Sequence, residues 1–237
     1  MKMIWYFLVE YMEELQKINV IYEDNHLLVV EKPINVPVCA DSSLDRDLLS
    51  TLKDYLKEKY HKPGSVYLGL VHRLDRPVSG VMVFAKTSKA ASRLGKQVSD
   101  HTLKKEYVAV VEGKVPVKGE FVDYLRKDEK KNISYVTDKH HGKEAKLYYK
   151  RLDYKNGFSL VEIHLETGRS HQIRVQFSSR RFPLVGDAKY NPNHDGKTSI
   201  ALFARKISFY HPITKELLQF EIDIPKRYPF SLFSKNT

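Results

Sequence analysis

Three short polar segments of the sequence carry side chains that could act together in catalysis. The first, residues 71–80 (VHRLDRPVSG), places Asp75 between two arginines and directly before a proline and a Ser-Gly turn. The flanking cations should favour the ionised carboxylate and lower its pKa, which suits a nucleophile better than a general acid. A salt-bridged surface loop would show the same pattern, so this segment alone leaves both interpretations open.

The second segment, residues 103–113 (LKKEYVAVVEG), alternates in the way of a half-buried strand. The alternation puts Tyr107 on one face, from which it could project toward a site, while Lys104 and Lys105 reach solvent or phosphate. Tyrosine is common in half-buried strands and the chain has 15 of them, so a packing role is the simpler interpretation of Tyr107 by itself.

The third segment, residues 165–177 (LETGRSHQIRVQF), is typical of a strand end, a tight glycine turn and a helix that Ser170 could cap. His171 and Arg174 then share a helix face. The helix start beside Arg169 would suit an anion or an RNA backbone, and Arg174 could reach inward to pair with a carboxylate. An ordinary exposed polar helix is the alternative.

A folded framework has to position these segments, and the apolar patterns predict an α+β fold with a mixed, mainly antiparallel sheet and flanking helices. The strand-like runs are residues 27–30, 80–85, 107–111, 146–152, 158–165, 200–210 and 217–224. Residues 31–33 should stop the first run, and residues 211–214 join the last two as in a hairpin.

Two amphipathic helices should accompany the sheet. The first follows the capping candidates Ser42 and Ser43, and its apolar stripe is Leu44, Leu48, Leu52, Tyr55 and Leu56. The second follows Thr87 or Ser88 as N-cap, and its stripe is Ala90, Ala91, Leu94 and Val98. The sequence shows no internal repeat, low-complexity tract or linker, so one catalytic unit is the simplest organisation.

The composition bounds the class of protein. A chain of 237 residues with 42% hydrophobic content can form one large domain or two closely packed lobes. Its 40 Lys and Arg against 29 Asp and Glu give a net charge of +11, which attracts phosphate-rich polymers or acidic membranes, although solubility alone would also account for it. The single cysteine, Cys39, cannot form an internal disulfide and fits a reducing cytoplasm.

Residues 1–20 are expected to be an N-terminal extension, either a short helix or an irregular start. Their apolar run is far shorter than a membrane span and lacks a small-residue cleavage site, so we expect neither an anchor nor a signal peptide. No metal is expected, because the sequence has no Cys-x-x-Cys pair and because His140 and His141 lack further ligands at useful spacing.

Taken in order, the three segments resemble those of the RluA-type family of RNA pseudouridine synthases. The matching segments are residues 72–80 for the signature loop, 105–107 (KEY) for the Lys-x-Tyr segment, 167–174 (TGRSHQIR) for the third, and 183–187 (PLVGD) for the one expected next. The resemblance runs from about Ile21 to about Pro225. It implies a synthase-like catalytic fold with a central cleft over residues 21–237, and no separate N-terminal S4 RNA-binding domain.

The sequence departs from the family pattern at two positions. Val78 stands where threonine is usual, and Phe203 stands where a histidine is frequent. Neither position coincides with the residues that the resemblance assigns to chemistry.

The resemblance implies a cofactor-free isomerase that breaks the N1–C1′ bond of uridine, turns the base and rejoins it through C5. Asp75 would be the nucleophile, and its attack on the sugar or on the base stays open. Tyr107 would be the stacking residue and general base, and Arg174 the ion-pair partner of Asp75. The predicted RNA contacts are His72, Arg73, Lys104, Lys105, Arg169, His171 and Gln172. Among these, Arg73 would fill the gap left by the flipped uridine.

The predicted substrate is a structured ribosomal or transfer RNA with an accessible loop or bulge, because flipping a base costs a few kcal/mol and costs least where it is unpaired. We expect a cytoplasmic monomer without a membrane partner. Residues 126–131 could also contact phosphate, but Asp128 and Glu129 interrupt the run of cations, which favours a solvated loop.

Two other functions would fit part of the pattern. A glycoside hydrolase would need a second carboxylate, about 5 Å away in a retaining enzyme, and the segments supply arginine and tyrosine instead. A non-catalytic RNA-binding module or RNA chaperone on the same fold would keep the basic surface without using Asp75.

Overall fold

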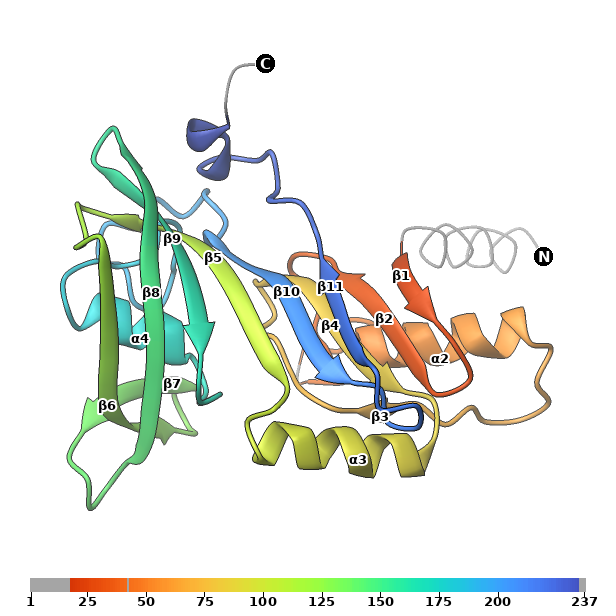
Figure 1. Cartoon of the computed structure of the whole chain (residues 1–237). Helices are drawn as coiled ribbons and strands as arrows, with labels where there is room; N and C mark the ends of the chain where they lie inside the picture. Colours follow the sequence, from red (N-terminus) through yellow and green to blue (C-terminus); the bar gives the residue numbers. More distant parts are fainter. Residues whose placement is uncertain (1–17, 42, 235–237) are drawn as a thin grey trace. The chain divides into compact units, whose positions relative to one another are not determined.

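A computed structural model describes residues 18–41 and 43–234, and the chain divides into two compact units (Figure 1). The first unit comprises the chain up to Leu103 together with Ser208–Phe220, and the second comprises Lys104–Ile207 together with the chain from Glu221 onward. Most of the expected N-terminal extension, residues 1–17, lies outside the described residues, as does the capping candidate Ser42.

An antiparallel sheet forms the centre of the first unit. Its strands are β1 (Asn19–Glu23), β2 (Leu27–Lys32) and β4 (Ser79–Ala85) in spatial order, with the short β3 (Gly69–Leu70) beside β4. The register of β2 and β4 runs from Leu27 opposite Ala85 to Lys32 opposite Gly80. All seven residues of β4 are buried, which requires cover on both faces of the strand.

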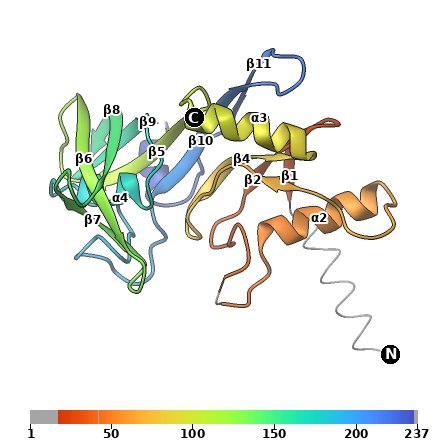
Figure 2. The same ribbon diagram turned by 90° about the horizontal axis from the view of Figure 1, so that it is seen from below.

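Two helices supply this cover, α2 (Leu48–Lys59) and α3 (Ser88–Ser99). Figure 2 shows β2 and β4 lying between them. Helix α3 begins where the sequence predicts, because the Thr87 hydroxyl accepts a hydrogen bond from the Ala90 backbone N at 3.1 Å. The amphipathic pattern therefore identified the helix and one of its two proposed caps correctly.

The predicted start of α2 is wrong. Its N-cap is Asp47, whose carboxylate accepts from the backbone N of Ser50 at 3.0 Å, and Ser43 lies before the helix. Leu44, which the apolar pattern placed on the buried stripe, is 93% exposed. Aspartate and serine are both good N-caps, so residue type alone did not distinguish Asp47 from the serines. The apolar stripe begins at Leu48, the first residue of α2, whose side chain is buried.

The second unit is built on a larger antiparallel sheet. Its neighbouring strands are β5 (Lys104–Glu112), β9 (Phe158–Leu165), β8 (Lys143–Lys155), β6 (Lys118–Asp128) and β7 (Ile133–Thr137). Strand β10 (Leu202–Tyr210) contributes its first six residues to the second unit and its last three to the first, and it pairs with β11 (Leu217–Glu221).

Each face of the second unit's sheet has its own cover. On one face lies α4 (Gln172–Ser178) (Figure 1). Its Phe177 packs against Phe121 and Tyr149, whose ring centroids lie 5.0 and 5.4 Å from that of Phe177. On the other face, residues such as Val108 and Val110 pack against Phe230 of the short 3-10 helix η1 (Phe230–Phe233). The aromatic cluster therefore fixes α4 on the first of these faces.

The predicted α+β class with a mainly antiparallel sheet is confirmed. The run 158–165 matches β9 at both ends, and the other predicted strands are present with shifted bounds. The interpretation of residues 126–131 as a solvated loop is wrong in part, because residues 126–128 belong to β6 and the turn after them leads into β7. Among the described residues, no helix is long and apolar enough to cross a membrane.

Candidate active-site residues in the two units

Asp75 lies in the first unit, in the loop between β3 and β4, and a buried lysine organises this loop. The backbone N of Val78 donates to the carbonyl of Asp75 at 2.9 Å. The Lys32 ammonium donates to the carbonyl oxygens of Pro33, Arg76 and Val78 at 2.9, 2.9 and 2.8 Å. Lys32 therefore binds two carbonyls of this loop and one of the segment after β2, although the sequence pattern had assigned it only to a strand stop.

Lys32 also brings a cation close to Asp75. The lysine side chain is 0% exposed, and burial lowers the pKa of Lys32 to about 7. The Asp75 carboxylate opposes this effect and Arg76 adds to it. Lys32 therefore lies close enough to Asp75 for the two charges to interact.

The two arginines beside Asp75 have different surroundings. The Arg76 guanidinium forms an ion pair with Asp45, and its Nε donates to the carbonyl of Asn35 at 3.1 Å. The Arg73 side chain is exposed. An exposed guanidinium fits the predicted contact of Arg73 with RNA, whereas Arg76 is used to hold the loop to the preceding segment.

His72, another predicted RNA contact, is only 8% exposed. Its Nε2 accepts a hydrogen bond from the backbone N of Val83 in β4 at 3.2 Å. This contact anchors the start of the Asp75 loop to the central strand, so the described role of His72 is structural. Its contact with RNA stays a prediction.

Tyr107 lies in the second unit on β5 and is 6% exposed. It stands opposite Ile163 of β9, which stands opposite Tyr149 of β8, so the three side chains share one face of the sheet. Tyr149 packs against Phe177 of α4. Tyr107 and α4, which carries Arg174, therefore lie on the same side of this sheet.

Arg174 is buried at 4% exposure and paired with a carboxylate that the sequence did not single out. Its Nε and Nη2 donate to Asp187 at 2.9 and 2.7 Å, and Asp187 is 0% exposed. A bidentate pair of this kind offsets much of the cost of burying a guanidinium. The prediction that Arg174 reaches inward to a carboxylate is confirmed with Asp187, and its pairing with Asp75 stays a prediction.

The start of α4 differs from the predicted one. Its N-cap is His171, which adopts a left-handed conformation with φ 54°, so the prediction that Ser170 caps this helix is wrong. The Nδ1 of His171 lies 2.7 Å from the Tyr190 hydroxyl, which also accepts from the backbone N of Ser134 at 2.6 Å. His171 thus takes part in a network that joins α4 to β7.

The remaining predicted RNA contacts range from buried to exposed. Gln172 is 3% exposed, and its amide bonds to Thr167, to the backbone N of Arg169 and to the carbonyl of Lys146, so its described contacts are structural. Arg169 is exposed and donates from Nε to the carbonyl of Glu144 at 2.8 Å.

The two lysines at the start of β5 line one pocket of the second unit. Its other lining residues are Glu106, Tyr148, His164, Leu165 and Glu166. Lys104 is exposed and lies 3.4 Å from Glu166. Lys105 is half-buried, and this burial lowers the pKa of its amine. The contact of these two lysines with RNA phosphate stays a prediction.

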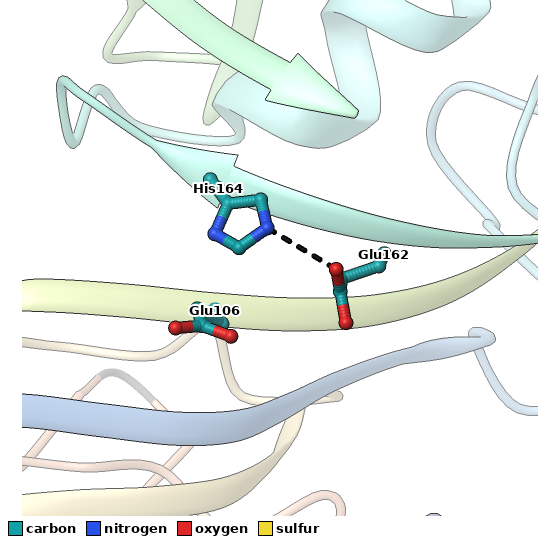
Figure 3. A group of neighbouring side chains, drawn as sticks. All are labelled: Glu106, Glu162 and His164. Atoms are coloured by element: carbon teal, nitrogen blue, oxygen red, sulfur yellow. Dashed lines mark hydrogen bonds and ion pairs between the residues drawn. The ribbon is translucent and has the colours of Figure 1, made fainter. Parts of the chain in front are cut away.

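A group of possible metal ligands, Glu106, Glu162 and His164, lies on β5 and β9 (Figure 3). Their ligand atoms lie within 4.8 Å of one another, and the His164 Nε2 is 3.2 Å from Glu162. Lys206 lies 3.8 Å from Glu106 and Arg205 lies 3.9 Å from Glu162. These cations balance the carboxylates, so we describe the group as a row of ion pairs and assign no metal to it.

Comparison with known proteins shows to which family the chain belongs. Residues 26–179 match the family model described as RNA pseudouridylate synthase, a stretch that contains Asp75, Tyr107 and Arg174. The chain belongs to the RNA pseudouridylate synthase family. This membership confirms the resemblance predicted from the three polar segments.

Individual members of this family show how far the likeness extends. The ribosomal large subunit pseudouridine synthase D of Neisseria meningitidis serogroup A is 35% identical over 228 residues, which cover 91% of this chain and 60% of that protein. An uncharacterized RNA pseudouridine synthase of Bacillus subtilis is 34% identical over 223 residues, covering 92% and 73%. The chain thus spans about 60% of the length of the first of these relatives.

Solved structures of the family show the same fold. The human RNA pseudouridylate synthase domain containing 4 aligns with a TM-score of 0.76 at 22% identity, covering 93% of this chain and 94% of that one. The human domain containing 1 aligns with a TM-score of 0.72 at 20% identity, covering 89% and 85%. The predicted synthase-like catalytic fold is therefore confirmed.

Proposed function

We propose that the chain is an RNA pseudouridine synthase that isomerises specific uridines of a structured ribosomal or transfer RNA. The observation that carries this proposal is the family match over residues 26–179, which contains the three residues to which we assign chemistry. The contacts of Asp75, Tyr107 and Arg174 within their own units support it, because each side chain is placed by a buried framework.

The reaction needs a nucleophile and a base but no cofactor. In our proposal, the Asp75 carboxylate acts as nucleophile during cleavage of the N1–C1′ bond, the freed uracil turns, and C5 bonds to C1′. The proton that leaves C5 is balanced by the proton that N1 gains, so atoms and electrons balance within the substrate and the protein. Tyr107 stacks on the base and accepts a proton as general base.

Arg174 provides the counter-ion that orients Asp75 in this proposal. A guanidinium is protonated at every pH at which the protein would work, so its charge is constant. Its burial strengthens any charge interaction that it makes, because little water screens it.

The RNA would be bound by the exposed cations near these residues. The exposure of Arg73, Lys104 and Arg169, the position of Lys105 and the net charge of +11 support this part of the proposal. Arg73 is the candidate to fill the gap left by the flipped uridine. His72, His171 and Gln172 would act beside the RNA mainly by holding the backbone that presents these cations. A ribosomal RNA target and the single Cys39 both fit a protein of the cytoplasm.

Release of tritium from RNA that carries [5-³H]uridine, in the absence of a methyl donor, tests the proposal directly, because isomerisation through C5 frees this hydrogen. We expect the wild-type protein to release tritium from ribosomal or transfer RNA transcripts without added metal or nucleotide. Asp75→Asn should abolish release and keep RNA binding in a mobility-shift assay. The control is Asp100→Asn, which changes an exposed carboxylate at the end of α3 and should leave both properties unchanged.

The outcomes separate the candidate functions. Release by Asp75→Asn at the wild-type rate would refute the mechanism. RNA binding by the wild-type protein without tritium release from any of these RNAs would instead support a non-catalytic RNA-binding module.

A further inference from the structure

Arg174 contacts two residues of the segment that follows α4, Asp187 and Tyr190. Its Nε and Nη2 form parallel hydrogen bonds with the two carboxylate oxygens of Asp187, at 2.9 and 2.7 Å. Its guanidinium carbon lies 5.1 Å from the centroid of the Tyr190 ring. The bidentate bonds fix the plane of the guanidinium, and the ring limits its movement out of that plane.

The Asp187 carboxylate is itself fixed. The side chain is 0% exposed, and its Oδ1 also accepts from the backbone N of Lys189 at 3.0 Å and of Tyr190 at 3.2 Å. Rotation of the carboxylate would break these backbone bonds together with the bonds to Arg174. The orientation of Arg174 is therefore set by the backbone of the turn.

Tyr190 forms hydrogen bonds through both its side-chain hydroxyl and its backbone carbonyl. Its hydroxyl contacts the Nδ1 of His171 and the backbone N of Ser134, at 2.7 and 2.6 Å, and its carbonyl accepts from the Ser178 hydroxyl at 2.6 Å. His171 and Ser178 lie at the two ends of α4. The ring over Arg174 is thus tied to the helix from which Arg174 projects.

We propose that Asp187 and Tyr190 are positioning residues that hold the Arg174 guanidinium in one orientation for the reaction. This inference rests on the proposed function, in which Arg174 orients Asp75. Neither residue needs to touch the RNA, because each acts through Arg174. A misplacement of about 1 Å at a reacting group can cost on the order of 100-fold in rate.

Substitution of Asp187 by asparagine isolates this role. The side-chain carbonyl of the introduced asparagine would retain the backbone bonds of Lys189 and Tyr190, so its NH₂ group would face the Nε–H donor of Arg174. Two donors repel, and the guanidinium should turn away. We expect Asp187→Asn to lower kcat for tritium release by about 100-fold with little change in the KM for RNA. Tyr190→Phe, which keeps the ring, should lower kcat by about tenfold or less.

A double-mutant cycle distinguishes positioning from general support of the fold. If Asp187 acts through Arg174, then Asp187→Asn should not lower kcat further in an Arg174→Lys background, which has lost the bidentate guanidinium. The matched control is Asp123→Asn, which removes a second Arg–Asp pair of the same unit, with Arg180 at 2.9 and 3.1 Å. It should lower Tm without changing kcat.

The results would separate the inference from the function on which it rests. Equal losses of kcat from Asp187→Asn in the wild-type and Arg174→Lys backgrounds would overturn the positioning role while the synthase activity stands. A loss of kcat by Asp123→Asn as large as that by Asp187→Asn would overturn it too. Absence of tritium release by the wild-type protein would overturn the proposed function, and the inference with it.

Discussion

Replacement of Glu23 by glutamine should destabilise the first unit at neutral pH but not in strong acid. The Glu23 side chain is 7% exposed and accepts hydrogen bonds from Lys59, Lys86, Tyr60 and Tyr55 at distances of 2.6 to 3.0 Å. Burial alone would raise the pKa of Glu23, but the bonds from Lys59 and Lys86, and then from the two tyrosines, lower it to about 2. The carboxylate thus joins β1, α2 and the end of β4.

The size of the effect follows from this pKa. A fall from 4.5 to about 2 corresponds to roughly 3 kcal/mol in the free energy of unfolding. Because the pKa is lower in the folded than in the unfolded chain, the contribution is complete above the unfolded value and is lost as the pH falls toward the folded value. It should therefore disappear between about pH 5 and pH 2. An exposed ion pair contributes only about 0–1 kcal/mol to the unfolding free energy, which is smaller than the contribution expected for Glu23.

Urea unfolding of the wild-type protein and of Glu23→Gln at a series of pH values measures this contribution. Hydrogen exchange of peptides from β1 and α2 assigns the change to the first unit. Glu58→Gln, at an exposed position of α2, is the control and should change the unfolding free energy by less than about 0.5 kcal/mol. A difference between wild type and Glu23→Gln that stays constant down to about pH 2 would refute the reasoning.

Two further substitutions test the frameworks of the candidate site. Lys32→Met leaves three backbone carbonyls without their lysine donor, so it should lower the unfolding free energy by about 3 kcal/mol and abolish most of the tritium release. Lys57→Met, at an exposed position, should change neither. Gly186→Ala should cost about 2–3 kcal/mol, because φ is +72° and a Cβ would lie 2.5 Å from the Ser199 carbonyl oxygen. Gly196→Ala, at φ +73° in open space, should cost less; equal melting temperatures for both alanine variants would contradict this account.

The sequence predicted the fold well wherever strands alternate or are wholly apolar. Strand β9 was predicted with both its bounds, because its apolar run is bounded by a glycine turn and by Glu166. Strand β6 was missed, since charged and polar residues surround its buried side chains, Phe121 and Leu125. A strand that fully buries only two of its residues gives little hydrophobic periodicity to detect.

The candidate site was predictable only in part, for a different reason. Asp75, Tyr107 and Arg174 stand in short segments whose residue types indicate chemistry. Lys32 and its acceptor Val78 are 46 positions apart, and only the fold brings them together. Asp187 lay within a segment that the resemblance had identified, but no role followed from its spacing, and Tyr190 was one tyrosine among 15.

The division of β10 between the two units has a consequence for synthesis on the ribosome. The first unit includes Ser208–Phe220, and this late segment is bound to early ones. The His211 Nε2 lies 2.9 Å from Asp24, 187 positions earlier, and Arg93 and Gln97 donate to the carbonyls of Pro212 and Tyr210. The unit that carries Asp75 therefore cannot be completed while the nascent chain ends before Phe220. Unlike a domain formed by one contiguous segment, it must wait until residues 208–220 have left the ribosome.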